Sequence, residues 1–184
     1  VVPEEYNLPN LTLKQYVKVH QDFYPRFSEE ILMKCLKDFE MQPDVNFKHL
    51  SMGQKKKIYM SFAVASCCQL LLMDEPTNGL DIPSKALFRK VIAGNLPADS
   101  SLIISTHQVH DVEQLLDHVF VLNNSEMIIN ASVEEIAKEY EFTYRNANEM
   151  DENVLYAEPS LQGNAVIARR KADSPETTIN LELL

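Results

Sequence analysis

The first third of the chain carries apolar residues at helical spacing in three successive stretches, each preceded by a hydroxyl side chain. The first stretch runs from Thr12 to Phe23 and ends before Pro25. The second begins at Ser28, which is followed by two glutamates that suit the positive end of a helix. The third begins at Ser51. Because serine and threonine side chains cap helix N-termini, the pattern predicts three short helices.

Short apolar runs then alternate with a further helical stretch. Leu70 to Met73 is bounded by Asp74 and predicts a buried strand, and the run from Ser101 to Ser105 predicts another. Between them, Asp81 is expected to cap a helix that has Pro83 in its first turn. Strand, helix and strand in this order predict an α/β fold with a helical insert ahead of it.

The rest of the chain contains shorter candidate elements. In chain order they are a helix over 109–116, strands over 119–122 and 127–129, and a helix over 133–140. From about Glu141 onward, a polar stretch precedes short apolar runs that predict strands over 154–157, 165–168 and 179–183. We therefore expect a small β-containing appendage at the C-terminal end.

Charge and cysteine content indicate which partners and which cellular compartment to expect. The 184 residues carry a formal net charge of -10, so nucleic acid would meet a repulsive average field and is not an expected partner. The three cysteines, two of them adjacent at Cys67 and Cys68, fit neither a disulfide framework nor a spaced zinc site, which favours a reducing cytosolic compartment. The longest apolar runs fall far short of the roughly 20 residues of a membrane helix. The run Lys55 to Lys57 is most simply a solvated helix face.

Candidate chemistry begins with two carboxylates at the end of the first predicted strand. In α/β sheets, ligands gather at the carboxyl ends of the strands. There Asp74 can hold Mg²⁺ directly or through water, and Glu75 can orient or deprotonate a water that attacks a phosphate. Taken alone, such a pair could also merely end a strand and cap a turn.

Two further positions suit phosphate chemistry. Ser51 offers its hydroxyl at a helix start, and Gly53 lets backbone N–H groups approach an anion, so this helix start is a candidate cradle for a γ-phosphate. His107 follows the second predicted strand and two hydroxyl residues, where it can donate to a phosphate oxygen or hold an attacking water. The other histidines lack such a context, and no carboxylate or thiol pattern completes a metal site around His107 and His110.

Four segments together resemble the motifs of the ATP-binding cassette (ABC) ATPases. Asp74 to Asp81 resembles their Walker B and D-loop run, and Leu50 to Gln54 resembles their signature motif. Downstream, Ile103 to His107 resembles the strand and switch histidine of the same family. Upstream, Val2 to Glu5 lies where the family's Q-loop enters the helical subdomain. The segments follow the family's order, and the resemblance covers about residues 1–140.

The resemblance implies a partial P-loop NTPase (RecA-like) core with the ABC helical subdomain. On this basis, residues 1–68 hold the end of the Q-loop, the helical subdomain and the signature helix. Residues 69–140 hold the second half of the ATPase core, with the Walker B run, the D-loop and the switch histidine. Residues 141–184 form the C-terminal appendage.

The resemblance also implies ATP and Mg²⁺ as cofactors and assigns roles to single residues. Asp74 and Glu4 would serve Mg²⁺, Glu75 would be the catalytic base, and His107 would be the switch residue. In this family two cassettes sandwich two ATP molecules head to tail, so that each site draws on both chains. The residues that would face the partner's ATP or cross the interface are Ser51, Gly53, Gln54 and, in the D-loop, Asp81.

The sequence departs from the family pattern in three places. Met52 replaces a glycine of the signature motif, and Glu4 stands where glutamine is commonest. No stretch matches G-x-x-x-x-G-K-[ST], and the glycines at positions 53, 79, 94 and 163 cannot build that phosphate-wrapping loop. We therefore expect a partial chain, and a gap between sheet neighbours where the strand of that loop would stand. Either a dimer or oligomer would cover this edge, or the remaining strands would close up into a distorted sheet.

Three function classes follow from these observations. The leading one is the ATP-hydrolysing subunit of an ABC transporter, which is cytoplasmic and peripheral on the inner face of the cell membrane. It would power a separate integral membrane permease by ATP-driven dimerisation. The second ABC ATPase subunit of the dimer would be either a copy of the same subunit or a different one. An ATPase of chromosome maintenance is disfavoured because no heptads precede Leu50. A non-hydrolysing regulatory or interaction module built from a partial cassette is the alternative.

The helical segment 12–40 is expected, by the same resemblance, to face the permease. It carries Tyr16, Phe23, Tyr24 and Phe27, which are more aromatic side chains than a solvated face needs. The other interpretation is that these rings simply pack the core of the subdomain.

Overall fold

The three N-terminal helices begin at the predicted hydroxyl caps in the computed structural model, which describes residues 1–171, 177 and 179–184. The helices are α1 (Leu13–His20), continued by the 3-10 turn η1 (Gln21–Phe23), α2 (Glu29–Asp38) and α3 (Met52–Ala65). The side chains of Thr12, Ser28 and Ser51 each accept the backbone N–H three residues further on. Each bond satisfies one of the unpaired N–H groups of a helix start. A second 3-10 turn, η2 (Phe47–His49), precedes α3.

These helices enclose one hydrophobic core within the first of two compact units, Val1–Leu115. Its buried members include Leu13, Tyr16, Leu36, Phe47, Ile58 and Phe62. Tyr24 and Phe27 pack against this cluster, and their rings lie 5.6 Å and 5.1 Å from that of Phe62. Tyr16, Tyr24 and Phe27 therefore pack the core, as the second interpretation proposed, whereas Phe23 is 77% exposed.

Two parallel strands form the sheet of this unit. Strand β1 (Leu70–Asp74) pairs with β2 (Ser101–Ser105) over five residues, from Leu70 opposite Ser101 to Asp74 opposite Ser105. β1 and β2 are joined directly by hydrogen bonds, so the expected gap does not lie between them, and among the described residues no strand pairs with the other edge of β2. On the other edge of β1, Val2 forms a single parallel bridge with Met73.

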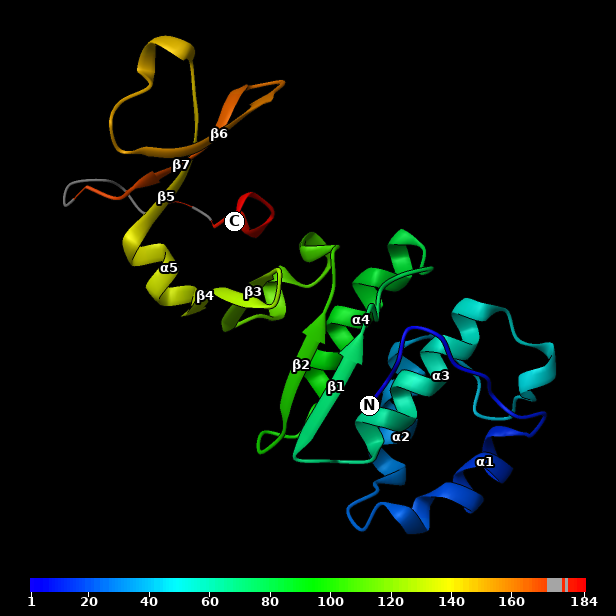
Figure 1. Ribbon diagram of the computed structural model, residues 1–184. Coiled ribbons are helices and arrows are strands. Elements are labelled where there is room, and N and C mark those ends of the chain that lie inside the picture. Colours follow the sequence, from blue (N-terminus) through cyan, green and yellow to red (C-terminus); the bar gives the residue numbers. More distant parts are fainter. Residues whose placement is uncertain (172–176, 178) are drawn as a thin grey trace. The chain divides into compact units, whose positions relative to one another are not determined.

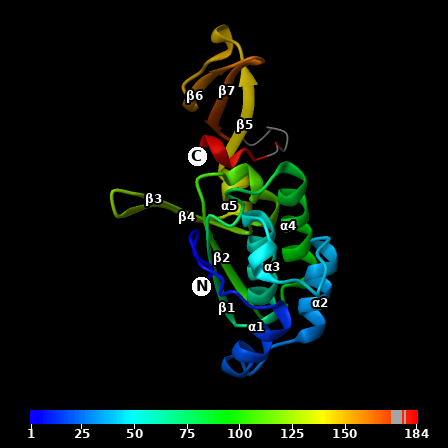
Figure 2. The same ribbon diagram turned by 90° about the vertical axis from the view of Figure 1, so that its right-hand side faces the viewer.

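The sheet is covered on one face rather than both. Figure 2 shows α3 and α4 on one side of β1 and β2, and Leu71 and Met73 are buried. Ile103 of β2 is 47% exposed and Leu70 of β1 is 53% exposed. The prediction of fully buried strands is therefore wrong for β2, whose residues are all exposed or half-buried, because the described part of this unit places no helix on its second face.

Helix α4 (Ile82–Asn95) connects the two strands (Figure 1). As predicted, Asp81 caps it, with its carboxylate accepting the Ser84 N–H at 2.9 Å, and Pro83 lies in its first turn. Phe88 and Val91 are fully buried on the face of α4 that packs against α2 and α3. The helix thereby fixes β1 and β2 against the helical core.

The segment after β2 is not the predicted α-helix over 109–116. It forms two 3-10 turns, η3 (Val109–Asp111) and η4 (Glu113–Leu115). Val112 N–H donates to the carbonyl of Val109, and Leu115 N–H donates to that of Val112. The apolar residues here are spaced by three, which fits the 3-10 repeat better than the α-helical one.

The second compact unit, Leu116–Leu184, begins with a hairpin and a short helix. Strands β3 (His118–Asn123) and β4 (Glu126–Ser132) are antiparallel, and the two turn residues between them both have positive φ. Helix α5 (Val133–Glu139) follows directly, with Ser132 as its cap. The hairpin and this helix confirm the sequence prediction.

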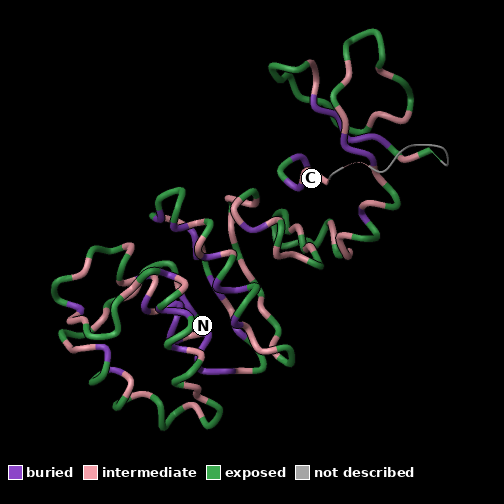
Figure 3. Tube along the Cα trace, turned by 180° about the vertical axis from the view of Figure 1, so that it is seen from behind, coloured by how far each residue is buried: buried purple, intermediate pink, exposed green. Residues whose placement is uncertain are grey.

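A three-stranded antiparallel sheet completes this unit. Its strands are β5 (Tyr140–Arg145), β6 (Val154–Ser160) and β7 (Gly163–Arg169), in the order β5-β7-β6. Figure 3 shows buried positions along β7, and Ile136, Phe142 and Ile167 lie in the core of the unit. The predicted β6 and β7 are confirmed, whereas β5 was not predicted.

The strand predicted over 179–183 is wrong. Leu181–Leu183 form the 3-10 turn η6, because the Asn180 side chain accepts the Glu182 N–H and starts a turn instead. Leu183 still packs into the core of this unit. Among the described residues, no helix is both long and apolar enough to cross a membrane.

Replacing Phe88 by alanine is expected to lower the free energy of unfolding of the first unit by about 3–5 kcal/mol, because the fully buried ring would leave a cavity. Urea denaturation followed by the helical circular dichroism signal measures this, since α1 to α4 all lie in this unit. Leu87→Ala on the same helix is the control, since Leu87 is only half-buried. Equal losses for the two variants would contradict the packing described for α4.

Candidate functional site

The carboxyl ends of β1 and β2 bring together three of the residues singled out in the sequence. Asp74 ends β1 directly opposite Ser105, the last residue of β2, and one Asp74 carboxylate oxygen accepts the Ser105 hydroxyl. Glu75 follows Asp74, and His107 lies two residues after Ser105. The parallel register therefore places both carboxylates beside the histidine at one edge of the sheet.

Glu75 is held by several hydrogen bonds. Its backbone N–H donates to the carbonyl of Ser105 at 2.9 Å, and its φ of 43° lies in the left-handed region. One carboxylate oxygen accepts the Thr106 hydroxyl at 2.9 Å. The other accepts the backbone N–H of His107 at 2.9 Å and lies 2.7 Å from Nδ1 of its ring.

The same contacts set the charge of Glu75. Burial raises the pKa of its carboxyl, but the hydrogen bonds from His107 and Thr106 outweigh this effect and hold the pKa below its ordinary value. Glu75 is thus an ionised carboxylate at neutral pH. The His107 side chain is 71% exposed, and with its Nδ1 on Glu75, its Nε2 remains available to a ligand.

The turn after Glu75 positions a further predicted residue. Asn78 N–H donates to the carbonyl of Glu75, Leu80 N–H donates to that of Thr77, and Gly79 takes a φ of 75° that suits glycine. The Asn78 side-chain amide donates to a carboxylate oxygen of Glu4. Glu4 therefore reaches this site from the N-terminal segment, as the resemblance implies.

Lys56 also belongs to the site, although the sequence pattern did not predict it. The prediction of a solvated lysine face is wrong for Lys56, which is 6% exposed, with its ammonium 2.6 Å from the carbonyl of Glu75 and 2.9 Å from that of Asn78. Helical spacing could have indicated this burial. Met60 and Val64 lie four and eight residues after Lys56, on the same face of α3, and both are fully buried. Burial lowers the pKa of the Lys56 ammonium, and the nearby carboxylates oppose this shift.

The signature-like residues lie at the start of α3. Ser51 and Gln54 cap the helix reciprocally, with Ser51 Oγ accepting the Gln54 N–H and the Gln54 side chain accepting the Ser51 N–H. A side chain at Gly53 would begin 3.9 Å from Leu80 and 4.0 Å from the carbonyl of Gly79. The helix start therefore lies against the turn after Glu75.

The structure thus separates the predicted residues into two groups. Asp74, Glu75 and His107 lie at the ends of β1 and β2, where Glu75 contacts His107 and Asp74 contacts Ser105, and Glu4 contacts Asn78 in the turn that follows β1. No described contact joins Ser51, Gln54 or Asp81 to those side chains; Ser51 and Gln54 cap α3, and Asp81 caps α4. Met52, at the variant signature position, is 67% exposed.

The donor set fits a magnesium ion that is held jointly with phosphate. Asp74 is exposed at the strand end, with one carboxylate oxygen on Ser105. Among the described residues, no group of three His, Cys, Asp or Glu side chains could hold a metal ion alone. Mg²⁺ commonly takes one or two carboxylates together with waters and substrate phosphates, which is what Asp74 can offer.

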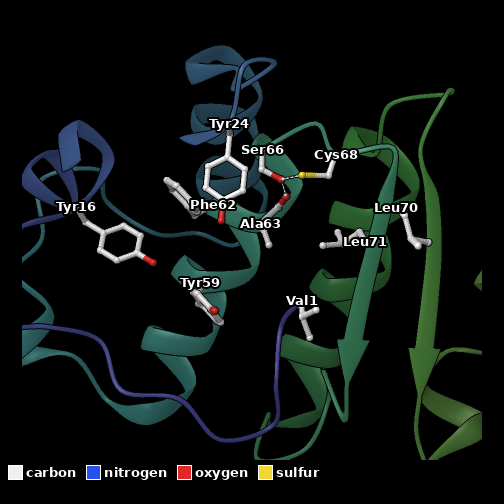
Figure 4. A pocket seen from close by; sticks show the side chains of 10 residues that line it. All are labelled: Val1, Tyr16, Tyr24, Tyr59, Phe62, Ala63, Ser66, Cys68, Leu70 and Leu71. Carbon is white, nitrogen blue, oxygen red and sulfur yellow. Dashed lines mark hydrogen bonds between the residues drawn. The ribbon is translucent and has the colours of Figure 1, made fainter. Parts of the chain in front are cut away.

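A small cavity lies at the other end of β1, away from the carboxylates. Its lining includes Tyr16, Tyr24, Tyr59 and Phe62 from the helical part, and Leu70 and Leu71 of β1 (Figure 4). Burial raises the pKa of Tyr16 to about 12 and also raises that of Tyr59. The lining contains no carboxylate, lysine or arginine, so the cavity does not suit a phosphate or a cation.

Comparisons with known proteins place this site in a family context. A protein-family model described as "AAA domain, putative AbiEii toxin, Type IV TA system" matches residues 35–110. The chain is 30% identical over 134 residues to the Nod factor export ATP-binding protein I of Rhizobium etli, covering 70% of this chain and 42% of that protein. It is 28% identical over 149 residues to the energy-coupling factor transporter ATP-binding protein EcfA2 of Clostridium perfringens, covering 74% and 51%.

A third relative is the ABC transporter ATP-binding protein YtrB of Bacillus subtilis, at 25% identity over 130 residues, which covers 70% of this chain and 44% of that protein. The chain therefore spans about half the length of the curated relatives it matches. A solved ATP-binding subunit of an ABC transporter superimposes with a TM-score of 0.62 and 22% identity, covering 73% of this chain and 59% of that one. A protein assigned to cobalt transport as an ATP-binding protein gives 0.61 and 17%, covering 93% and 63%.

The structural neighbours confirm the predicted fold, a mixed helix and strand architecture of the P-loop NTPase class. The sequence relatives confirm the resemblance, since they are ATP-binding proteins of ABC transporters and align over 70% or more of this chain. The chain belongs to the ATP-binding cassette ATPase family.

Proposed function

We propose that this chain is part of an ABC transporter subunit that binds and hydrolyses ATP. The observation that carries the proposal is the pairing of Glu75 with Thr106 and His107 beside Asp74, at the ends of two adjacent parallel strands. A carboxylate that can orient water, an imidazole that can contact a phosphate and a magnesium ligand at one sheet edge suit phosphoryl transfer to water.

Glu75 is proposed as the base that orients and deprotonates the attacking water. Its carboxylate is ionised, and the hydrogen bonds from Thr106 and His107 fix its direction. His107 is proposed to contact the γ-phosphate through Nε2, because Nδ1 faces Glu75 and the ring is exposed. Orientation by fixed hydrogen bonds is a large part of catalysis when little covalent chemistry falls to the protein.

Asp74 and Glu4 are proposed to hold Mg²⁺ together with the phosphates. When bound, this ion would neutralise charge that develops on the phosphate oxygens. Asp74 lies at the end of β1, and Glu4 is fixed to Asn78 in the turn that follows. The two carboxylates would then approach the ion from separate segments of the chain.

The second group of residues is proposed to serve a partner ATPase subunit. Ser51, Gly53 and Gln54 form a helix start whose positive end suits the phosphates of an ATP held by that partner. Ser51 Oγ accepts a hydrogen bond within the cap, so its hydroxyl hydrogen can be donated outward. Asp81, at the start of α4, is proposed to contact the partner across the interface.

An integral membrane permease is the proposed second partner, with the subunit on the cytoplasmic face of the cell membrane. The relatives named for export and energy-coupling transport support this. Of the four aromatic residues in the helical segment, Phe23 offers an exposed ring for such a contact, because the other three pack the core.

Glu75→Gln is expected to reduce ATP hydrolysis by about 10²-fold or more in the full-length protein that contains this chain, while ATP binding persists. The amide keeps the size of the side chain but removes the base. Steady-state phosphate release and equilibrium ATP binding measure the two effects. Glu29→Gln, an exposed acid in the first turn of α2, is the matched control. Near-normal turnover by Glu75→Gln would refute the base assignment, whereas absence of ATP hydrolysis in the wild-type full-length protein would favour the non-hydrolysing module.

The 184-residue chain alone is expected neither to bind ATP tightly nor to hydrolyse it. Its sequence contains no phosphate-wrapping loop with its lysine, which provides most phosphate contacts, and Asp74 and Glu75 would repel a polyphosphate. Calorimetric titration with Mg-ATP measures the affinity. Micromolar binding at one ATP per chain would show that the site does not depend on that loop.

A cysteine at position 23 is expected to cross-link to a co-purified membrane partner in the full-length complex, because Phe23 is 77% exposed. Leu161→Cys in the second unit is the matched control, since it replaces another exposed apolar side chain and lies outside the helical segment. Cross-linked products on a denaturing gel measure the contact. If position 23 gives no more product than position 161, permease docking through this segment is wrong.

A further inference from the structure

The buried ammonium of Lys56 has no place in the chemistry proposed above, although it contacts the backbone of the candidate site. It bridges two carbonyl groups, those of Glu75 and Asn78, which lie at the two ends of one turn. Removing an ammonium from water is costly unless strong hydrogen bonds replace the hydration. A lysine in α3 could instead extend into solvent, so its burial calls for a compensating interaction at this turn.

The turn to which Lys56 donates hydrogen bonds begins with an unfavourable backbone conformation at Glu75. Glu75 takes a φ of 43°, a region that residues with a Cβ rarely adopt. Within the turn, the Glu75 carbonyl accepts the Asn78 N–H at 3.2 Å, which is longer than the 2.6 Å bond from Lys56. Hydrogen bonds from a charged donor are stronger than neutral ones, so Lys56 is the dominant contact at this carbonyl.

Lys56 also supplies positive charge among carboxylates. Glu4, Glu75 and Asp74 are the charged groups that act on its ammonium. The carboxylates of Glu4, Asp74 and Glu75 repel one another. The positive charge of Lys56, which acts on all three, reduces that repulsion. The same residue therefore stabilises both the backbone shape and the charge arrangement of the site.

The helix that carries Lys56 also begins at the signature-like cap. Gly53 lies against the carbonyl of Gly79 and the side chain of Leu80, one turn of helix before Lys56. The start of α3 and the turn after Glu75 are thus joined at two places, by close packing at Gly53 and by the Lys56 bridge.

We infer that Lys56 is a positioning residue, which holds the turn from Glu75 to Asn78 so that the Glu75 carboxylate stays on Thr106 and His107. The catalytic consequence rests on the proposed function, whereas the effect on the turn does not. Lys56 acts through Glu75, since its ammonium bonds only carbonyl groups among the contacts described.

The test compares Lys56→Met, Lys56→Gln and Lys56→Arg with Lys55→Met as the matched control. Methionine keeps an unbranched apolar stem and removes both hydrogen bonds, glutamine keeps two N–H donors without charge, and arginine keeps both charge and donors. Lys55 is the preceding lysine of the same helix and is less buried than Lys56.

The first measurement is amide hydrogen exchange in the 184-residue chain. The Asn78 and Leu80 N–H groups close the turn, so Lys56→Met should speed their exchange by about tenfold or more, which is the scale of one charged hydrogen bond. The Val166 amide in β7 of the second unit should be unchanged. Lys56→Gln should give an intermediate effect and Lys56→Arg a smaller one, and Lys55→Met should give none. If Asn78 and Leu80 exchange at the wild-type rate in both Met and Gln variants, the positioning role is wrong.

The second measurement is steady-state ATPase activity of the full-length protein. Lys56→Met should lower kcat by about tenfold or more with little change in KM, because Lys56 holds the base and does not contact nucleotide. Lys56→Arg should restore most of kcat. An unchanged kcat in the Met variant, or a loss that arginine does not rescue, would overturn the catalytic consequence. If the wild-type protein shows no ATPase activity, the proposed function fails, and the exchange measurement still decides whether Lys56 holds the turn.

Discussion

The parallel register of β1 and β2 is the constraint on which the candidate site depends. Asp74 and Ser105 are 31 residues apart in the chain but are paired at the ends of the two strands. One further backbone bond, from Glu75 N–H to the Ser105 carbonyl, continues the ladder past Asp74. That bond brings the Glu75 carboxylate to Thr106 and His107. A shift of one residue would separate all these groups, since it turns each side chain to the other face.

Helix starts and the residues after the strands could be predicted because their causes are local. Thr12, Ser28, Ser51 and Asp81 each cap a helix through a bond to a residue three positions away. The carboxylates and His107 follow apolar runs, and parallel strands bring their carboxyl ends to one edge. The α-helix predicted over 109–116 was wrong, because apolar residues spaced by three also fit consecutive 3-10 turns.

Burial could not be predicted in the same way, because it depends on what covers each surface. Leu70 and Ile103 are apolar strand residues that remain about half exposed, since helices cover one face of the sheet. Lys56 shows the opposite case, a charged residue that is almost fully buried. Its position is set by carbonyl groups in a turn about twenty residues further along the chain, and these become its neighbours only when the strand folds beside α3.

The two groups of candidate residues are mechanically connected although no side chain joins them directly. Ser51 and Asp81 each cap a helix through one acceptor oxygen, which fixes the side chain at the helix start. The hydroxyl hydrogen of Ser51 and the second carboxylate oxygen of Asp81 can then make other contacts. Gly53 permits the start of α3 to lie against Gly79 and Leu80, just before the Asp81 cap. The start of α3 therefore packs directly against the turn whose first residue, Glu75, is held by Thr106 and His107.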